Sequence, residues 1–316
     1  MRILVLGAGG TGGYFGGRLA QSGADATFLV RPARAAQLER DGLRIRSPLG
    51  DADLRVAHAT ADALPALAKR RPFDLVVLSC KAYDLDGSID AIAPAVAEGT
   101  TVLPILNGLR HYDALDVRFG RERVLGGLCF ISATKGADGE ILHLGKPASI
   151  TFGERASNGC DGSEITPCVA AFAALCEKAG IDHKASADIA QDQWIKFTFL
   201  ATLAAGTCLM RASVGGIVSA EGGADFLRAL HAETLAIAEA QGRPVPVEAR
   251  EIARASFADP ASPVKASMLR DLEQGQRVEA AHIIGDMVHR ARAAGLATPL
   301  LDAAWVHLQV YEATLS

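Results

Sequence analysis

The first half of the chain alternates short aliphatic runs with segments of helical character. Four runs are almost continuously apolar, as strands buried on both faces of a parallel sheet are. They are Arg2–Leu6, Ala24–Val30, Phe73–Cys80 and Thr100–Leu106. Because parallel strands need crossover connections, usually helices, this order predicts an α/β domain built on an open parallel sheet. The segment from Tyr14 to Ser22, closed by Gly23, is predicted to be the first of these helices.

Other stretches of the first half alternate apolar and polar residues with the period of two that is typical of half-buried strands. Leu43–Arg46 and Leu54–Ala57 are predicted to form a hairpin around Pro48 to Asp51. Further antiparallel strands at the sheet edge are predicted at Gly126–Ile131, Ile141–Leu144 and Ser149–Phe152, with turns at Asp138-Gly139 and Lys146-Pro147. A helix over Thr166–Ala179 and a last strand over Ile181–Ala185 complete a first domain of residues 1–185.

Beyond residue 185 the periodicity becomes that of long helices. The helical segments are Ala187–Ala205, Ala224–Gln241, Val278–Ala294 and Pro299–Leu315. We therefore expect residues 186–316 to form an all-α domain that carries the substrate and catalytic residues. Its apolar surface could bury a homodimer interface or only its own core.

Composition narrows the class of protein. The chain has 316 residues, a formal net charge of -4 and a hydrophobic content of 49%. The charge argues against a nucleic-acid partner, and no apolar run reaches the ~18 residues of a membrane span. We expect a cytoplasmic protein without a signal peptide, with six reduced cysteines and no metal site, because neither cysteines nor histidines have ligand spacing.

A glycine-rich turn follows the first strand. Gly7, Gly9 and Gly12 have the G-x-G-x-x-G spacing, with Gly10 and Thr11 between the last two. The first glycine allows a tight turn, the second a close approach of backbone to pyrophosphate, and the third close packing of helix on sheet. Phosphates would bind the N–H groups at the helix start. The context of strand, turn and helix therefore predicts a dinucleotide site.

The end of the second strand bears on the choice of cofactor. An NAD-binding domain usually has an acidic residue here, whereas this chain has Arg31 and then Arg34. A guanidinium suits the 2′-phosphate of NADP through paired, charge-assisted hydrogen bonds. We predict NADP, with Arg31 as the first candidate; a solvated surface arginine is the alternative, more so for Arg34.

Two further strands end in polar residues. Phe73–Cys80 leads directly into Lys81, and Thr100–Leu106 into Asn107. Ligands of open α/β sheets bind at the carboxyl ends of the strands, so either side chain could be functional or an ordinary loop residue. In the helical half, Lys196 stands among Trp194, Phe197 and other apolar residues. Such a lysine either extends its amine to water or serves a function.

These motifs together resemble the ketopantoate reductase family over essentially the whole chain. The resemblance is carried by Gly7-Ala-Gly-Gly-Thr-Gly, Arg31, Ser79-Cys-Lys81-Ala, Leu106-Asn107-Gly108, Trp194-Ile-Lys196 and Ser267-Met-Leu with Glu279 twelve residues later. It implies a Rossmann domain followed by an all-α domain, and reduction of a 2-keto acid by NADPH.

The resemblance also implies roles for individual residues. Lys196 corresponds to the general acid, and Lys81 and Asn107 to positions around nicotinamide and substrate. Ser267 corresponds to a residue that binds the substrate carboxylate. Glu279 corresponds to a glutamate that helps to hold the lysine and the nicotinamide ribose. From the sequence alone, Ser267 could instead cap a helix and Glu279 could be an acid favoured by a helix dipole.

The chain departs from the family pattern at three positions. Leu200, Ala204 and Val214 replace asparagines that would donate hydrogen bonds to ketopantoate. A pocket without them should discriminate less well in favour of a hydroxylated substrate. Three functions therefore stay open: ketopantoate reduction in pantothenate biosynthesis, reduction of a more apolar 2-keto acid to a D-2-hydroxy acid, and a non-catalytic NADP-binding regulator.

Overall fold

The computed structural model describes residues 1–156 and 161–315, so Cys160 lies outside the described residues. The chain divides into two compact units. The first comprises Met1–Leu106 and His111–Ile189, and the second comprises Asn107–Arg110 and Ala190–Ser316. The boundary after residue 185 stays a prediction about the domains. The structural division differs from it in two ways: residues 186–189 belong to the first unit, and Asn107–Arg110 belong to the second.

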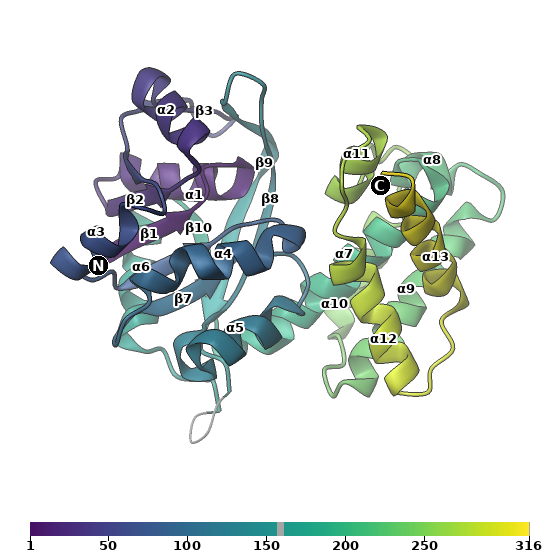
Figure 1. The fold of residues 1–316 in the computed structure, drawn as a ribbon. Helices are drawn as coiled ribbons and strands as arrows, with labels where there is room; N and C mark the ends of the chain where they lie inside the picture. The colour runs from purple at the N-terminus through teal and green to yellow at the C-terminus, as the bar shows by residue number, and fades with distance from the viewer. Residues whose placement is uncertain (157–160, 316) are drawn as a thin grey trace. The chain divides into compact units, whose positions relative to one another are not determined.

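The first unit contains the expected parallel sheet (Figure 1). Its strands are β1 (Arg2–Leu6), β2 (Asp25–Leu29), β5 (Ala57–Ala59), β6 (Leu75–Leu78) and β7 (Thr101–Pro104), in the order β5-β2-β1-β6-β7. All neighbouring pairs are parallel. In the central strand β1, Ile3, Leu4 and Val5 are fully buried. The continuous apolar runs therefore predicted four of these strands, β1, β2, β6 and β7, and missed β5.

The helices of the first unit alternate with these strands. They are α1 (Gly10–Gln21), α2 (Pro32–Asp41), α3 (Leu64–Arg70), α4 (Leu85–Ile92), α5 (His111–Phe119) and α6 (Pro167–Lys178). Short 3-10 turns occupy Ala82–Asp84, Ala93–Ala95 and Arg121–Arg123. Prolines stand in the first turns of α2, α3 and α6, where the missing N–H group costs no helical hydrogen bond.

The remaining strands of this unit form a second sheet. They are β3 (Leu43–Arg46), β4 (Ala52–Leu54), β8 (Gly126–Lys135), β9 (Ile141–Gly153) and β10 (Asp182–Ala185). The order is β10-β9-β3-β4, with β8 also paired to β9. The hairpin of β3 and β4 is antiparallel as predicted. Its second strand ends at Leu54, however, and Ala57–Ala59 joins the parallel sheet instead.

The turn predicted at Lys146-Pro147 is wrong, because β9 continues through it. The pairing of β8 with β9 shifts here, from Ile131 opposite Ala148 to Ala133 opposite His143. Between these pairs β9 has the four residues 144–147 where β8 has only Ser132, so β9 carries three extra residues. Pro147 has no backbone N–H, and it lies among the residues of β9 that are not paired with β8, where no N–H is needed for pairing. Its carbonyl accepts a hydrogen bond from His143 Nε2 at 3.0 Å.

Helix α1 packs between the two sheets and contacts strands of both. Its glycines make this approach possible. A Cβ at Gly16 would lie 2.8 Å from the ring of Phe28, on the parallel sheet. A Cβ at Gly17 would lie 2.6 Å from Ile45 Cδ1, on the second sheet. The run of glycines therefore extends beyond the turn because the helix is covered on two sides.

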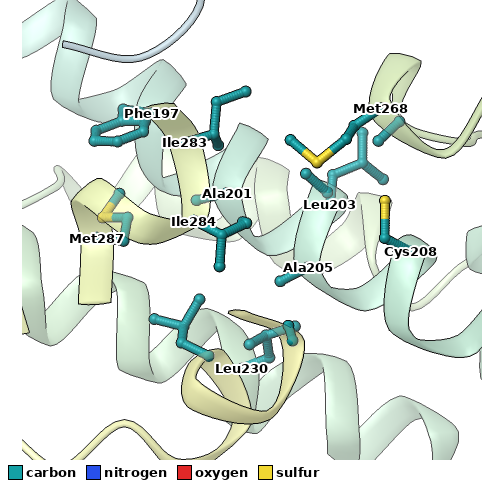
Figure 2. Close-up of a cluster of buried hydrophobic side chains, with 14 of the residues drawn as sticks. Phe197, Ala201, Leu203, Ala205, Cys208, Leu230, Met268, Ile283, Ile284 and Met287 are labelled. Atoms are coloured by element: carbon teal, nitrogen blue, oxygen red, sulfur yellow. The ribbon is translucent and has the colours of Figure 1, made fainter. Parts of the chain in front are cut away.

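The second unit is helical, and no strand occurs in its described part. Its helices are α7 (Ile189–Met210), α8 (Val214–Val218), α9 (Gly223–Ala240), α10 (Val247–Ser256), α11 (Ser267–Glu273), α12 (Asp286–Ala293) and α13 (Pro299–Ala313). None of the described helices of the chain is long and apolar enough to cross a membrane. Figure 2 shows the buried cluster of this unit, to which α7, α9, α11 and the segment before α12 contribute side chains.

The long helix predicted over Val278–Ala294 is interrupted. Ala281–Gly285 is π-helical, and the α-helix α12 starts only at Asp286. The π-helical segment has only five residues, which is too short for a periodicity read over about 11–18 residues to distinguish it from an α-helix. The helices α8, α10 and α11 were also not predicted; each has ten residues or fewer.

We predict opposite effects on stability for two glycine-to-alanine substitutions in helices. Gly16→Ala should lower the free energy of unfolding by about 1 kcal/mol or more, because the new Cβ would overlap the buried Phe28 ring. Gly87→Ala in α4 should raise it by about 0.5–1 kcal/mol, because no described atom lies within 4 Å of its Cβ position. Urea unfolding measures both changes, and a stabilised Gly16→Ala protein would contradict the close packing of α1.

Candidate functional site

The glycine turn lies between β1 and α1, at the carboxyl edge of the parallel sheet. Gly7 has φ +87°, a conformation that favours glycine, and its N–H donates to the carbonyl of Leu29 at 2.9 Å. Gly9 precedes the first residue of α1 and offers no side chain to cap it. A Cβ at Gly9 would meet none of the described atoms within 4 Å. The turn therefore leaves open space in front of uncapped N–H groups, which suits an anion.

The other glycines of the turn approach protein atoms. A Cβ at Gly12 would collide with Ser79 Oγ and would lie 2.6 Å from the carbonyl oxygen of Gly7. Ser79, at the end of β6, donates from Oγ to the carbonyl of Leu6 at 2.8 Å and so links the ends of two strands. A Cβ at Gly10 would lie 2.5 Å from the carbonyl oxygen of Ala133. Gly10 and Gly12 thus serve packing, whereas Gly7 and Gly9 shape the turn; Thr11, in the first turn of α1, is half-buried.

The two candidate arginines have different surroundings. Arg31 immediately precedes α2, and its side chain is 83% exposed and forms an ion pair with Asp84 at 3.2 Å. Arg34 is half-buried, and its Nη2 donates to the carbonyl of Ala8, inside the glycine turn, at 3.0 Å. Arg34 Nε is buried without a hydrogen-bond partner among the described residues. The alternative of a solvated surface arginine is therefore wrong for Arg34, which supports the turn directly.

Lys81 stands where the sequence placed it, three residues after the end of β6. It caps the 3-10 turn Ala82–Asp84 with extended backbone angles. Its side chain is half-buried. Three candidate features thus follow strands of one parallel sheet in the first unit. The glycine turn follows β1, Arg31 follows β2 and Lys81 follows β6.

Lys196 and Asn107 meet in the second unit. Lys196 Nζ donates to Asn107 Oδ1 at 3.0 Å, across 89 residues of sequence. Lys196 lies on α7 and is only 8% exposed, with Trp194 and Phe197 buried beside it. Little of the residue is therefore exposed, which counts against a side chain that simply extends to water. Burial of an amine is costly unless it is hydrogen-bonded, and the Asn107 amide provides such a bond.

Glu279 and His282 lie at the start of the interrupted helix, and both are buried, each 7% exposed. The carbonyl of Glu279 accepts from the N–H groups of His282 and Ile283 at 3.2 and 3.1 Å. Burial lowers the pKa of His282, and Arg110 adds to this effect, while Glu279, Asp286 and a hydrogen bond to the backbone of Asn107 oppose it. Sequence reasoning missed His282. The spacing of three residues from Glu279, which places both on one side of a helix, is the signal that could have found it.

Ser267 is the first residue of α11 and does not cap it, because the capping position belongs to Ala266. Its side chain is half-buried. Its hydroxyl makes no hydrogen bond to the part of the chain that the structure describes. The alternative of a capping serine is therefore wrong, and the hydroxyl is available to a ligand.

The three positions that depart from the family pattern are apolar in structure as well as in sequence. Leu200 lies one turn after Lys196 on α7 and packs against the buried cluster. Ala204, one turn further, and Val214, at the start of α8, are each 1% exposed. No polar side chain is therefore supplied from these positions.

The parallel sheet with its glycine turn defines the first unit as a Rossmann-type dinucleotide-binding fold, and the second unit adds a helical domain with a buried lysine. A model of the family Ketopantoate reductase PanE/ApbA matches residues 3–157, and a model of its C-terminal part matches residues 188–312. The chain belongs to this family, whose members are oxidoreductases that act on CH–OH groups.

Individual relatives agree with this assignment. An uncharacterized oxidoreductase of Bacillus subtilis, YkpB, is 36% identical over 313 residues, which cover 99% of each chain. The crystal structure of 2-dehydropantoate 2-reductase from Geobacter metallireducens has a TM-score of 0.86 at 28% identity, covering 98% of this chain and 99% of that one. A D-mandelate dehydrogenase, solved with NADH and anilino(oxo)acetate, has a TM-score of 0.86 at 20% identity, covering 100% and 99%, and shows the likeness of fold alone.

Proposed function

We propose that this protein uses NADPH to reduce the carbonyl group of a 2-keto acid, giving a 2-hydroxy acid, with Lys196 as the general acid. The observation that carries the proposal is the hydrogen bond of the buried Lys196 Nζ to Asn107 Oδ1 at 3.0 Å. A buried lysine that an amide holds in place is suited to acid catalysis, because its position is fixed and its amine is shielded from bulk water.

The chemistry follows from the charge that develops on the substrate. NADPH, when bound, supplies the hydride that adds to the carbonyl carbon. The C–O double bond gives its electron pair to oxygen, and Lys196 Nζ stabilises this negative charge and donates its proton there. Asn107 directs the amine without neutralising it, because an amide oxygen carries no net charge. Glu279, on the same unit, is proposed to help hold the lysine and the nicotinamide ribose.

The first unit supports the cofactor part of the proposal. The open space at Gly9 and the uncapped start of α1 fit a pyrophosphate. The exposed Arg31 guanidinium fits a 2′-phosphate, for which it would exchange its partner Asp84. Arg34 supports the turn through Ala8, and its unpartnered Nε is a further donor for an anion. Lys81 is proposed to lie near the nicotinamide.

Two substrates are candidates. Family membership favours ketopantoate, and Ser267 offers a hydroxyl for the carboxylate of any 2-keto acid. The apolar Leu200, Ala204 and Val214 favour a 2-keto acid with an alkyl or aryl side chain. A site that lacks the donors for a substrate hydroxyl gains little from binding it.

Steady-state oxidation of NADPH and NADH with ketopantoate, 2-ketoisovalerate and benzoylformate tests the proposal. We expect turnover with at least one acid, and a higher kcat/KM with NADPH than with NADH. A kcat/KM clearly highest for ketopantoate would exclude the apolar substrate. Normal NADPH binding without oxidation by any acid would contradict the enzymatic proposal and favour a non-catalytic regulator.

Loss of the proposed acid should slow the reaction without loss of cofactor binding. Lys196→Ala should lower kcat by ~100-fold or more, because no other group would stand in for the proton donor. The dissociation constant for NADPH should change by less than about threefold. Lys265→Ala, which removes a lysine of the same unit that pairs with Glu273, is the matched control and should keep wild-type kcat. Unchanged turnover of Lys196→Ala would refute the acid role.

The two arginines should give different signatures in cofactor binding. Arg31→Ala should weaken NADPH by ~10-fold or more and leave NADH nearly unchanged, because only NADPH carries the 2′-phosphate. Arg34→Ala should weaken both, since it also releases the carbonyl of Ala8. Arg40→Ala, on the exposed side of α2, should affect neither. Equal weakening of both cofactors by Arg31→Ala, measured by fluorescence titration, would mean that Arg31 does not bind the phosphate.

A further inference from the structure

His282 packs against the turn that carries Asn107. The backbone at Gly108 has φ +77°, and a Cβ there would lie 2.9 Å from His282 Cδ2 and 3.0 Å from the carbonyl oxygen of the same residue. Only glycine satisfies both demands, the left-handed backbone and the lack of space. The imidazole of His282 therefore packs closely against the backbone of the Asn107-Gly108 turn.

The same imidazole also bonds to the turn. It makes a hydrogen bond to the backbone of Asn107, and this bond raises the pKa of the ring. A bond that favours the protonated ring is one in which the ring N–H donates, so the acceptor is the Asn107 carbonyl. The Asn107 side chain meanwhile accepts from Lys196 Nζ. The backbone and side chain of Asn107 thus have separate partners, one on the π-helical segment and one on α7. Fixing the backbone fixes the direction from which the side chain approaches the lysine.

The surroundings keep the imidazole in place. Its neighbours in sequence, Ile283 and Ile284, are 2% and 0% exposed and belong to the buried cluster of Figure 2, together with Phe197 and Ala201 of α7. The charged groups that act on the ring are Glu279, Asp286 and Arg110. Burial lowers the pKa of His282, so its ring is neutral near pH 7 and retains one N–H to donate.

The local helix geometry is consistent with a special role. His282 lies in the π-helical segment Ala281–Gly285, which begins two residues after Glu279. A π-helical turn has less favourable geometry than an α-helix, and such turns occur often at functional sites. Here the segment is the element that brings His282 to Gly108.

We propose that His282 is a positioning residue for the reduction, because it holds the Asn107-Gly108 turn so that Asn107 can direct the Lys196 amine. The expected effect on kcat rests on the proposed function. The expected hold of His282 on the turn rests only on contacts within the second unit.

Two substitutions separate the ring's hydrogen bond from its volume. His282→Phe keeps a planar ring without an N–H donor, whereas His282→Gln keeps a donor on a flexible side chain. We expect His282→Phe to lower kcat by about 10–100-fold, with the KM for NADPH within about twofold, because a small displacement of a catalytic group costs this much. His282→Gln should recover much of the loss. A kcat of His282→Phe equal to that of wild type would overturn the proposal.

His231 provides a matched control within the same unit. It is a histidine of α9, equally 7% exposed, that contacts Phe257, and burial lowers its pKa to about 4. His231→Phe should alter the stability of the protein and leave kcat unchanged. A similar loss of kcat in both variants would show a general loss of packing and would count against a positioning role.

Amide hydrogen exchange gives a readout that does not need activity. Peptides covering residues 105–110 should exchange at least about fivefold faster in His282→Phe than in wild type, with a smaller change in His282→Gln. Equal exchange in all three proteins would overturn the proposal even if no substrate were found. Conversely, an inactive Lys196→Ala protein beside a fully active His282→Phe protein would leave the proposed function intact and remove only the role of His282.

Discussion

The hydrogen bond from Lys196 Nζ to Asn107 Oδ1 requires that helix α7 and the Asn107-Gly108 turn be held close together in the second unit. An amine that is 8% exposed among aromatic side chains must have an acceptor. The Asn107 amide orients the amine and carries no net charge of its own. An acceptor of this kind suits the acid role proposed for Lys196.

The first unit meets a different constraint, that of a helix placed between two sheets. Gly16 and Gly17 allow α1 to contact Phe28 and Ile45 on opposite sides. Close packing on both sides fixes the axis of α1 and with it the direction of its first N–H groups. Gly9 then leaves those groups uncovered. One glycine-rich stretch thus gives both rigid packing and an open anion site, since a bare helix start is useful only if its position is fixed.

Sequence reasoning was most accurate for features that depend on residues close together in the chain. Continuous apolar runs predicted four of the five parallel strands, and the helical period predicted the helical second unit. The pairing of Lys196 with Asn107 links residues 89 apart, so no local pattern contains it. His282 has no partner histidine at the spacing of a metal ligand pair. Its contact with Gly108 depends on a π-helical turn, which the sequence pattern does not distinguish from an α-helix. Pro147 suggested a turn because the extra residues of β9 cannot be seen without their partner strand.

Helix α7 connects the proposed chemistry with the choice of substrate. Lys196, Leu200 and Ala204 follow one another at intervals of four residues, so they lie along one side of a single helix of 22 residues. A change from asparagine to leucine or alanine at the later positions removes hydrogen-bond donors without moving the backbone that carries the lysine. Selectivity can therefore change while the acid and its amide partner stay in place. The proposed acid and the proposed substrate preference therefore rest on different residues of one helix, so a change in the side chain of the substrate does not require a change in the chemistry.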